Sequence, residues 1–232
     1  MKPLKYSLSK VLPATLLFTL FSFALHAGWQ TPSPQEVVED DFSKNDKGGD
    51  FPKGWKTYPF QMGKAKAVYK IGEENGKKFV RANDSQDISM PIFKDFPWPL
   101  EDYPILKWRW RAQQLPVGAK ENSRDTNDSA CGVYVTFGKT SGIAIKYVWS
   151  SSLPPGHVWA KEPGEFYVVV MDSGSGKLGQ WQEQKANVLA DFKKLFGKDP
   201  SRDPTAIGIM TDGNATHTAS ACDYGDFVIS KP

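Results

Sequence analysis

The sequence has few of the residues that build metal and nucleophile sites. Its 232 residues include three histidines and two cysteines, and neither His157 nor His217 belongs to a cluster with zinc-ligand spacing. A serine-hydrolase elbow, a phosphate-binding loop and a dinucleotide fingerprint are also absent. The sequence therefore does not identify a reaction.

Long apolar runs are also missing, except near the start of the chain. Residues 1–10 contain three lysines and no acid, and an apolar run follows at residues 11–25. Pro13 interrupts this run, which is shorter than the roughly 20 residues that span a bilayer. The pattern predicts a cleaved export signal and no membrane span after cleavage. The expected division of the chain is a signal at 1–27, a lead-in at 28–37 and one domain at 38–232.

An excess of one charge is absent from the part that follows the expected signal. Residues 1–27 hold three of the 29 lysines and arginines and none of the 26 acids, which leaves 26 of each. A nearly neutral domain has no strong positive field for nucleic acid. We therefore expect no nucleic-acid partner.

Cysteine occurs only at Cys131 and Cys222. Export places the domain in the periplasm or outside the cell, where an even cysteine count favours a disulfide. The alternative is two buried free thiols, because spacing alone does not show that the two residues meet.

Most of the chain consists of short runs in which β-branched and aromatic residues alternate with polar ones. About a dozen strands are predicted, and those that matter below lie at 56–60, 67–71, 105–112, 143–149 and 226–230. One helix is predicted near 187–196, with Asn187 as its N-cap and Gly197 after its last turn. Because strands and helices do not alternate, the predicted fold is all-β, an antiparallel two-sheet sandwich of the jelly-roll type.

An ordered set of strings resembles a known family. The strings are PILKWRWR at 104–111, GVYVTF at 132–137, LGQW at 178–181, NVLADF at 187–192, GIMTD at 208–212 and YGDF at 224–227. Together they resemble the bacterial family of unknown function numbered 3047 over about residues 38–230. The resemblance implies an exported β-sandwich with no established activity.

A weaker similarity is to galactose-binding-like and carbohydrate-binding jelly rolls. It rests on an acidic-aromatic start at 40–42, the FPKGW turn at 51–55, and Asp226 before an apolar strand end. This similarity implies a carbohydrate ligand.

The strand with the clearest chemistry is KWRWR at 107–111. Its alternation points Trp108 and Trp110 to the core and the cations, among them Arg109 and Arg111, to the other face. Guanidinium groups recognise anions and polar ligands. The alternative is that the cations pair with acids of neighbouring strands, such as Asp128, Glu165 or Asp226.

Two further groups of residues extend this candidate ligand face. Lys146 joins it if the strand at 143–149 neighbours the one at 105–112. Trp149, Trp159 and Trp181 lie beside loops where an exposed ring could stack on a sugar, although a tryptophan more often packs against the core. The predicted ligand-binding residues are Arg109, Arg111, Asp128, Lys146, Trp149 and Trp181.

Acidic residues near the two ends of the domain suggest a structural calcium site. If the first and last strands are neighbours, Asp41 and Asp226 come together as oxygen ligands. The alternative is that these acids form turns and loop caps. No other cofactor is expected.

Three functions remain open from the sequence. The first is an exported, non-catalytic binding protein for a carbohydrate or another polar or anionic envelope ligand. The second is a glycan hydrolase or lyase with paired carboxylates drawn from acids such as Asp128, Glu162, Glu165 and Glu183. The third is an envelope accessory or interaction protein with a large exposed apolar patch.

Overall fold

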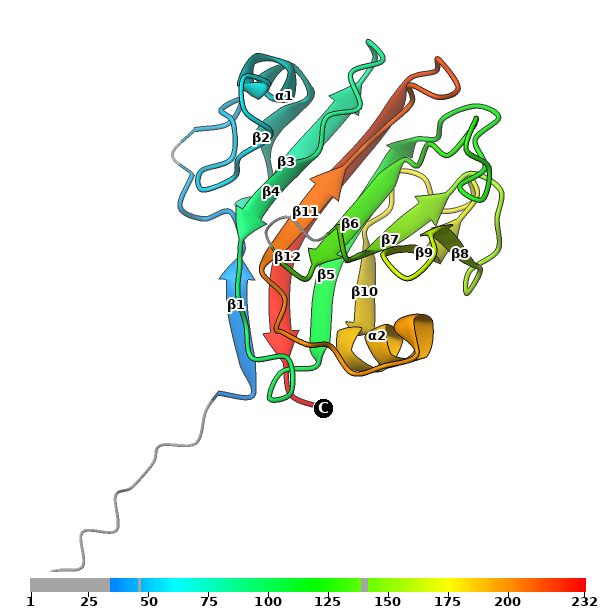
Figure 1. Cartoon of the computed structure of the whole chain (residues 1–232). Coiled ribbons are helices and arrows are strands. Elements are labelled where there is room, and N and C mark those ends of the chain that lie inside the picture. Colours follow the sequence, from blue (N-terminus) through cyan, green and yellow to red (C-terminus); the bar gives the residue numbers. More distant parts are fainter. Residues whose placement is uncertain (1–33, 46, 139–141) are drawn as a thin grey trace, which may run out of the picture. The chain divides into compact units, whose positions relative to one another are not determined.

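Two β-sheets face one another across the core in the computed structural model (Figure 1). The structure describes residues 34–45, 47–138 and 142–232. The expected signal at 1–27 lies outside the described residues, as does most of the expected lead-in. Residues Pro34–Pro232 form one compact unit. Within that described part, no helix is long and apolar enough to cross a membrane.

Sheet A has the strand order β10-β5-β12-β3-β2, and β1 pairs with the end of β12 that β3 leaves uncovered. All of its pairs are antiparallel. The strands of this sheet are β1 (Glu36–Asp40), β2 (Tyr69–Glu74), β3 (Lys77–Asp84), β5 (Ile105–Gln114), β10 (Gln182–Asn187) and β12 (Ser220–Ser230).

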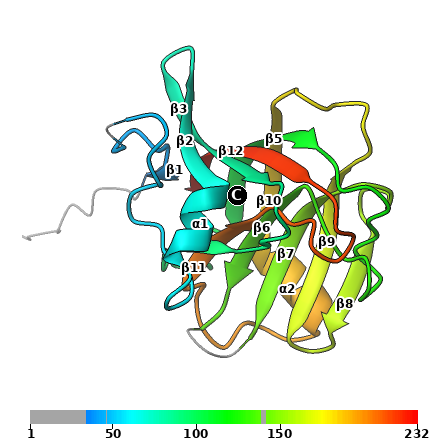
Figure 2. The ribbon, with the colours of Figure 1, turned by 90° about the horizontal axis from the view of Figure 1, so that it is seen from above.

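Sheet B has the order β4-β11-β6-β7-β9-β8, with β7 and β9 parallel and the other pairs antiparallel. Its strands are β4 (Ile92–Asp95), β6 (Cys131–Thr136), β7 (Ala144–Ser150), β8 (Val158–Glu162), β9 (Phe166–Ser173) and β11 (Ala206–Met210). Figure 2 shows β6, β7, β9 and β8 side by side, with β5 and β12 across the core. The predicted all-β sandwich is confirmed.

Large aromatic side chains fill the space between the sheets. Trp108 and Trp110 of β5 point inward, and their rings lie 5.4 Å from Tyr147 and 6.3 Å from Trp149 of β7 between centroids. All four side chains are almost fully buried. The inward direction predicted for the two β5 tryptophans is therefore confirmed.

A disulfide links the two sheets. Cys131 at the start of β6 is bonded to Cys222 of β12, and their Cα atoms are 5.5 Å apart. The bond predicted from the cysteine count is confirmed, and it fixes β6 of sheet B to the central strand of sheet A.

The predicted helix is confirmed as α2 (Val188–Phe196). The Asn187 side chain accepts a hydrogen bond from the Ala190 N–H, and Gly197 follows in the left-handed conformation. Phe192 packs on Phe137 with ring centroids 4.6 Å apart, which docks the helix at one end of the sandwich (Figure 1).

A second helix, α1 (Met62–Val68), was not expected from the sequence. The strand predicted at 67–71 begins only at Tyr69, and the strand predicted at 56–60 is reduced to one bridge between Lys56 and Phe93. Ala65 and Val68 are buried three positions apart, so the packing of this short face against sheet A favours a helix there.

Candidate functional site

The predicted cationic face lies on the outer surface of sheet A, and its cations are paired. Lys107 Nζ lies 2.6 Å from Glu36 Oε1, and Arg109 Nε lies 2.7 Å from Asp226 Oδ2. Arg111 contacts both Asp223 and Glu74, at 2.7 and 3.0 Å. These contacts match the alternative expectation, in which the cations pair with acids of neighbouring strands.

Trp181 covers the two guanidinium groups. Arg109 Cζ and Arg111 Cζ lie 4.4 and 4.6 Å from its ring centroid, and its Nε1 donates to Glu74 Oε2 at 3.2 Å. The Phe79 ring packs edge-on against it at 5.4 Å. The side chains of Arg109 and Arg111 are 16% and 10% exposed. The structure therefore brings Arg109, Arg111 and Trp181 together, but mainly in contact with one another.

Lys146 does not join this face. Its strand β7 pairs with β6 and β9 in sheet B, so the hypothesis that it neighbours residues 105–112 is wrong. Trp149 of the same strand points inward, is fully buried and donates from Nε1 to the Gly174 carbonyl. Its ring is part of the core and is not available at the surface.

Asp41 and Asp226 lie near one another, as expected, because β1 pairs with β12. Both line a surface hollow of about 500 Å³, together with Lys77 and Lys78. Calcium takes about six to eight oxygen ligands, whereas Asp226 is already bound to Arg109 and two lysines share the lining. No group of three or more histidine, cysteine or acidic residues suited to a metal occurs among the described residues. These residues therefore fit calcium poorly.

The outer face of sheet B carries a row of side chains at one level, here called the sheet B row. Strand register places its members opposite one another from β4 to β8. Directly paired residues project to the same face of a sheet, so the row forms a continuous line across six strands. In strand order its members are Phe93, Gly208, Tyr134, Lys146, Val168 and Trp159.

Several aromatic rings lie along or beside this row. The Tyr134 ring lies 6.2 Å from Phe93 and 6.0 Å from Phe166, which sits two residues before Val168 on β9. All three rings are partly exposed. Gly208 allows this arrangement, because a Cβ there would lie 2.5 Å from the Phe93 ring. Tyr58, which is 56% exposed, extends the rings beyond β4 at 6.0 Å from Phe93.

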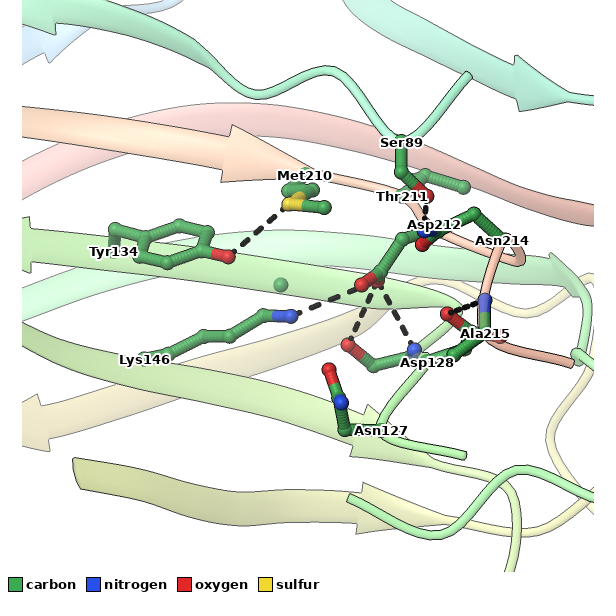
Figure 3. Close-up of polar contacts among 12 residues, drawn as sticks. Ser89, Asn127, Asp128, Tyr134, Lys146, Met210, Thr211, Asp212, Asn214 and Ala215 are labelled. Carbon is green, nitrogen blue, oxygen red and sulfur yellow. Dashed lines mark hydrogen bonds and ion pairs between the residues drawn. The ribbon is translucent and has the colours of Figure 1, made fainter. Parts of the chain in front are cut away.

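A buried charge lies in the middle of the row. Lys146 Nζ is 3.6 Å from Asp212 Oδ1 and 5.3 Å from the Tyr134 ring centroid (Figure 3). Gly132 makes room for it, since a Cβ there would lie 2.6 Å from Lys146 Cε. Burial favours the neutral amine, but Asp212 and Tyr134 together hold the pKa of Lys146 above its ordinary value. Lys146 is therefore protonated at neutral pH.

Asp212 and Glu121 add buried carboxylates beside Lys146. Asp212 accepts hydrogen bonds from the backbone N–H and the hydroxyl of Ser129. Glu121 Oε2 accepts from the Ser150 hydroxyl, whereas Glu121 Oε1 is buried and has no hydrogen-bond partner among the described residues. Burial raises the pKa of Glu121. The cluster thus combines one cation with carboxylates that are held away from water.

Asp128, which the sequence predicted as a ligand residue, lies next to this cluster (Figure 3). Its two oxygens accept from the backbone N–H groups of Ala215 and Thr216 and from the Thr216 hydroxyl. Both oxygens are therefore engaged in holding the loop that follows Asp212.

Of the predicted ligand residues, Lys146 belongs to the sheet B row and Asp128 borders it. Phe93, Tyr134, Phe166 and Asp212 were not predicted from the sequence as site residues. A signal for Tyr134 was present, because the alternation in GVYVTF sets it opposite the buried Val133 and Val135.

Comparisons with known proteins give a family and several solved structures of low sequence identity, among them a carbohydrate-binding module and an endoglucanase. A family model described as "Protein of unknown function (DUF3047)" matches residues 53–228. No curated protein matches the sequence. The family 11 carbohydrate-binding module from Clostridium thermocellum, solved with a β-1,3-1,4-mixed-linked tetrasaccharide, is 11% identical with a TM-score of 0.41, covering 84% of this chain and 95% of that one. The endoglucanase cel12A from Rhodothermus marinus is 12% identical with a TM-score of 0.43. This match covers 85% of the present chain and 99% of the endoglucanase chain.

Proposed function

We propose that this chain, which belongs to the DUF3047 family of proteins of unknown function, binds a carbohydrate on the outer face of sheet B. The observation that carries the proposal is the set of contacting, partly exposed rings of Phe93, Tyr134 and Phe166. Sugar rings have C–H faces that pack on aromatic rings. Ligand sites commonly combine such apolar surface with a few fixed polar groups.

Polar groups lie at the same level as the rings. Lys146 and Asp212 hold one another in place, and Lys161 of β8 and Asn127 lie at the β8 side of the rings. Sugar hydroxyls both donate and accept hydrogen bonds, so a mixture of ammonium, amide and carboxylate groups suits them. Because these side chains are already held by their neighbours, little ordering would accompany binding.

The protonation states of Lys146 and Tyr134 suit ligand binding. Lys146 is held in its charged form by Asp212, and burial raises the pKa of Tyr134 above its ordinary value. A general acid or base works best when its pKa lies near the operating pH. Neither group would exchange a proton readily at neutral pH, whereas burial raises the pKa of the Glu121 and Asp212 carboxyls, so the proposal of binding without catalysis rests on the aromatic rings.

The proposed place of action is the periplasm or the outside of the cell. Support comes from the export-signal pattern at residues 1–27 and from the disulfide between Cys131 and Cys222, a bond that persists in oxidising compartments. Glycans of the envelope or its surroundings are then the accessible ligands.

The test is binding of the purified, disulfide-bonded chain to a panel of soluble polysaccharides, measured by affinity electrophoresis and calorimetry. Tyr134→Ala removes the central ring, and Trp181→Ala is the matched aromatic change on sheet A. We expect Tyr134→Ala to weaken binding about two- to tenfold, since a ring contact contributes about 0.5–1.5 kcal/mol beyond its buried area. Trp181→Ala should bind like the original chain.

Thermal unfolding of each variant checks that the sandwich stays folded, and Tyr134→Phe, which keeps the ring, should retain binding. Equal losses in Tyr134→Ala and Trp181→Ala would contradict the placement of the site. A folded original chain that binds no polysaccharide would contradict the function itself.

A further inference from the structure

Lys161 stands out on the outer face of sheet B because of where the backbone places it. The pairing of β8 with β9 passes from Ala160 opposite Tyr167 to Glu162 opposite Phe166, so Lys161 is the extra residue of a β-bulge. A bulge re-aims the side chain that it carries, and bulges are common beside functional sites. Here the bulge sends the Lys161 side chain toward Phe166, at the edge of the aromatic surface.

The Lys161 ammonium is only partly satisfied in the described part of the chain. It donates to Asn127 Oδ1 at 3.1 Å and lies 5.8 Å from the centroid of the Phe166 ring. An ammonium has three N–H donors, and within residues 34–45, 47–138 and 142–232 no carboxylate oxygen lies within 4.0 Å of Nζ. The nearby Glu162 pairs with Arg124 instead, at 3.0 Å. Lys161 therefore has donors left for a ligand.

The charges around Lys161 favour an anion. Burial lowers the pKa of Lys161 most and the Lys146 cation lowers it further, Asp212 raises it, and Arg124 and Glu162 make smaller contributions of opposite sign. A partly buried ammonium close to a second cation is less favourable than one in water. A negative group beside Lys161 would offset both the burial and the repulsion from Lys146.

We propose that Lys161, held in place by the side-chain oxygen of Asn127, binds the acidic group of an anionic sugar, a carboxylate or a sulfate, whose ring packs on Phe166. This inference rests on the proposed carbohydrate-binding face and narrows its ligand to acidic glycans. The acidic oxygen accepts from the free Lys161 N–H groups. The Asn127 amide N–H already donates to the Arg124 carbonyl at 2.6 Å, so Asn127 fixes the ammonium through its oxygen.

The test compares three polysaccharide probes that differ in charge: polygalacturonate, dextran sulfate and a neutral mixed-linked glucan. Lys161→Gln removes the charge, Lys161→Arg keeps it, and Lys185→Gln is the control, because Lys185 is an exposed lysine on β10 of sheet A. Calorimetry at neutral pH and low salt gives the affinity of each variant for each probe.

We expect the original chain to prefer an acidic probe, and its choice between polygalacturonate and dextran sulfate identifies the carboxylate or the sulfate. Lys161→Gln should bind that probe with about tenfold lower affinity, as expected for the loss of a charge-assisted contact. Its affinity for the neutral glucan should change little. Lys161→Arg should retain most of the affinity, and Lys185→Gln should bind every probe as the original chain does. Added salt should weaken the binding of the acidic probe alone.

Three results separate this inference from the proposed function. If the neutral glucan binds as tightly as the acidic probes, and only Tyr134→Ala weakens it, the acidic specificity is overturned while the carbohydrate face stands. If Lys161→Gln weakens acidic and neutral probes equally, the inference is likewise overturned. If no probe binds the folded original chain, the proposed function fails first.

Discussion

Lys146 and Asp212 form an ion pair that is almost fully buried, with side chains 7% and 4% exposed. Removing one partner of such a pair leaves the other charge uncompensated away from water. We therefore expect Lys146→Met to lower the free energy of unfolding by about 3 to 5 kcal/mol, measured by urea denaturation at neutral pH.

Two comparisons isolate the charge from the loss of the side chain. Adding Asp212→Asn to Lys146→Met keeps an acceptor for Ser129 and removes the stranded carboxylate, so the double variant should be more stable than Lys146→Met alone. Lys185→Met, at an exposed position, should stay within about 0.5 kcal/mol of the original chain. A single variant as stable as the double one would show that the pair contributes little.

Glu121 gives a prediction about pH. Burial raises the pKa of this carboxyl above its ordinary value of 4.5, so just above that value the folded chain holds a proton that the unfolded chain has lost. The contribution of Glu121 to the free energy of unfolding is therefore fully present below this pH window. It is lost as the pH rises through the window. Glu121→Gln removes this decrease and keeps a side-chain oxygen for Ser150.

The stability of Glu121→Gln relative to the original chain should therefore be greater at about pH 7 than at about pH 4. Urea denaturation at the two pH values measures the difference. Glu183→Gln, at an exposed carboxylate on β10, is the matched control and should show no such change. A relative stability of Glu121→Gln that falls with rising pH would contradict the assignment.

For single residues of the site, the alternation along a strand predicted which face a side chain lies on, but not which strands are its neighbours. The alternation at 143–149 places Lys146 on the face opposite to Ile145, Tyr147 and Trp149, and these three side chains are buried in the core. It did not show which strands flank β7, because pairing with β6 and β9 depends on contacts distant in sequence. Lys146 was therefore assigned to the wrong face, and its partner Asp212 was missed.

At the scale of elements, α2 was predictable because the sequence has a capping residue at each of its ends. The Asn187 side chain accepts from the Ala190 N–H at 2.9 Å, and Gly197 has a φ of 67°. Helix α1 has no side-chain cap and only seven residues, so nothing local separated it from a strand. Packing of Ala65 and Val68 decided its conformation.

The caps of α2 lead to a prediction for this element. Asn187→Ala should destabilise the protein by about 1 kcal/mol, because an N–H of the first turn loses its acceptor. Asn187→Asp should retain most of the stability, since aspartate also accepts this bond and suits the helix N-terminus. Chemical denaturation measures both, and equal stability of Asn187→Ala and the original chain would show that the cap is dispensable.

For the whole molecule, composition and alternation were enough to predict two packed sheets but not the assignment of strands to them. The first and last strands are neighbours, as the calcium hypothesis required, whereas the parallel pairing of β7 with β9 follows from β8 lying at the edge of sheet B. The functional face depended on this assignment. Residues 107–111 became a paired surface of sheet A, and the rings that the sequence left unassigned met on sheet B.

The disulfide between the two sheets allows a direct test of what their covalent link contributes to stability. Cys131 and Cys222 are 91 residues apart in sequence and join β6 to β12, so their bond restricts a large part of the unfolded chain. Loop-closure entropy predicts a contribution of roughly 4 kcal/mol. In a domain of this size that loss corresponds to a fall of about 10 °C in the melting temperature. We expect the double variant Cys131→Ala with Cys222→Ala to melt lower by that amount, and reduction of the original chain to have a similar effect.

Below its melting temperature the double variant should still bind the polysaccharide, because the rings of Phe93, Tyr134 and Phe166 all lie on sheet B. A double variant that stays folded and loses binding would instead show that the position of β6 against sheet A controls the site.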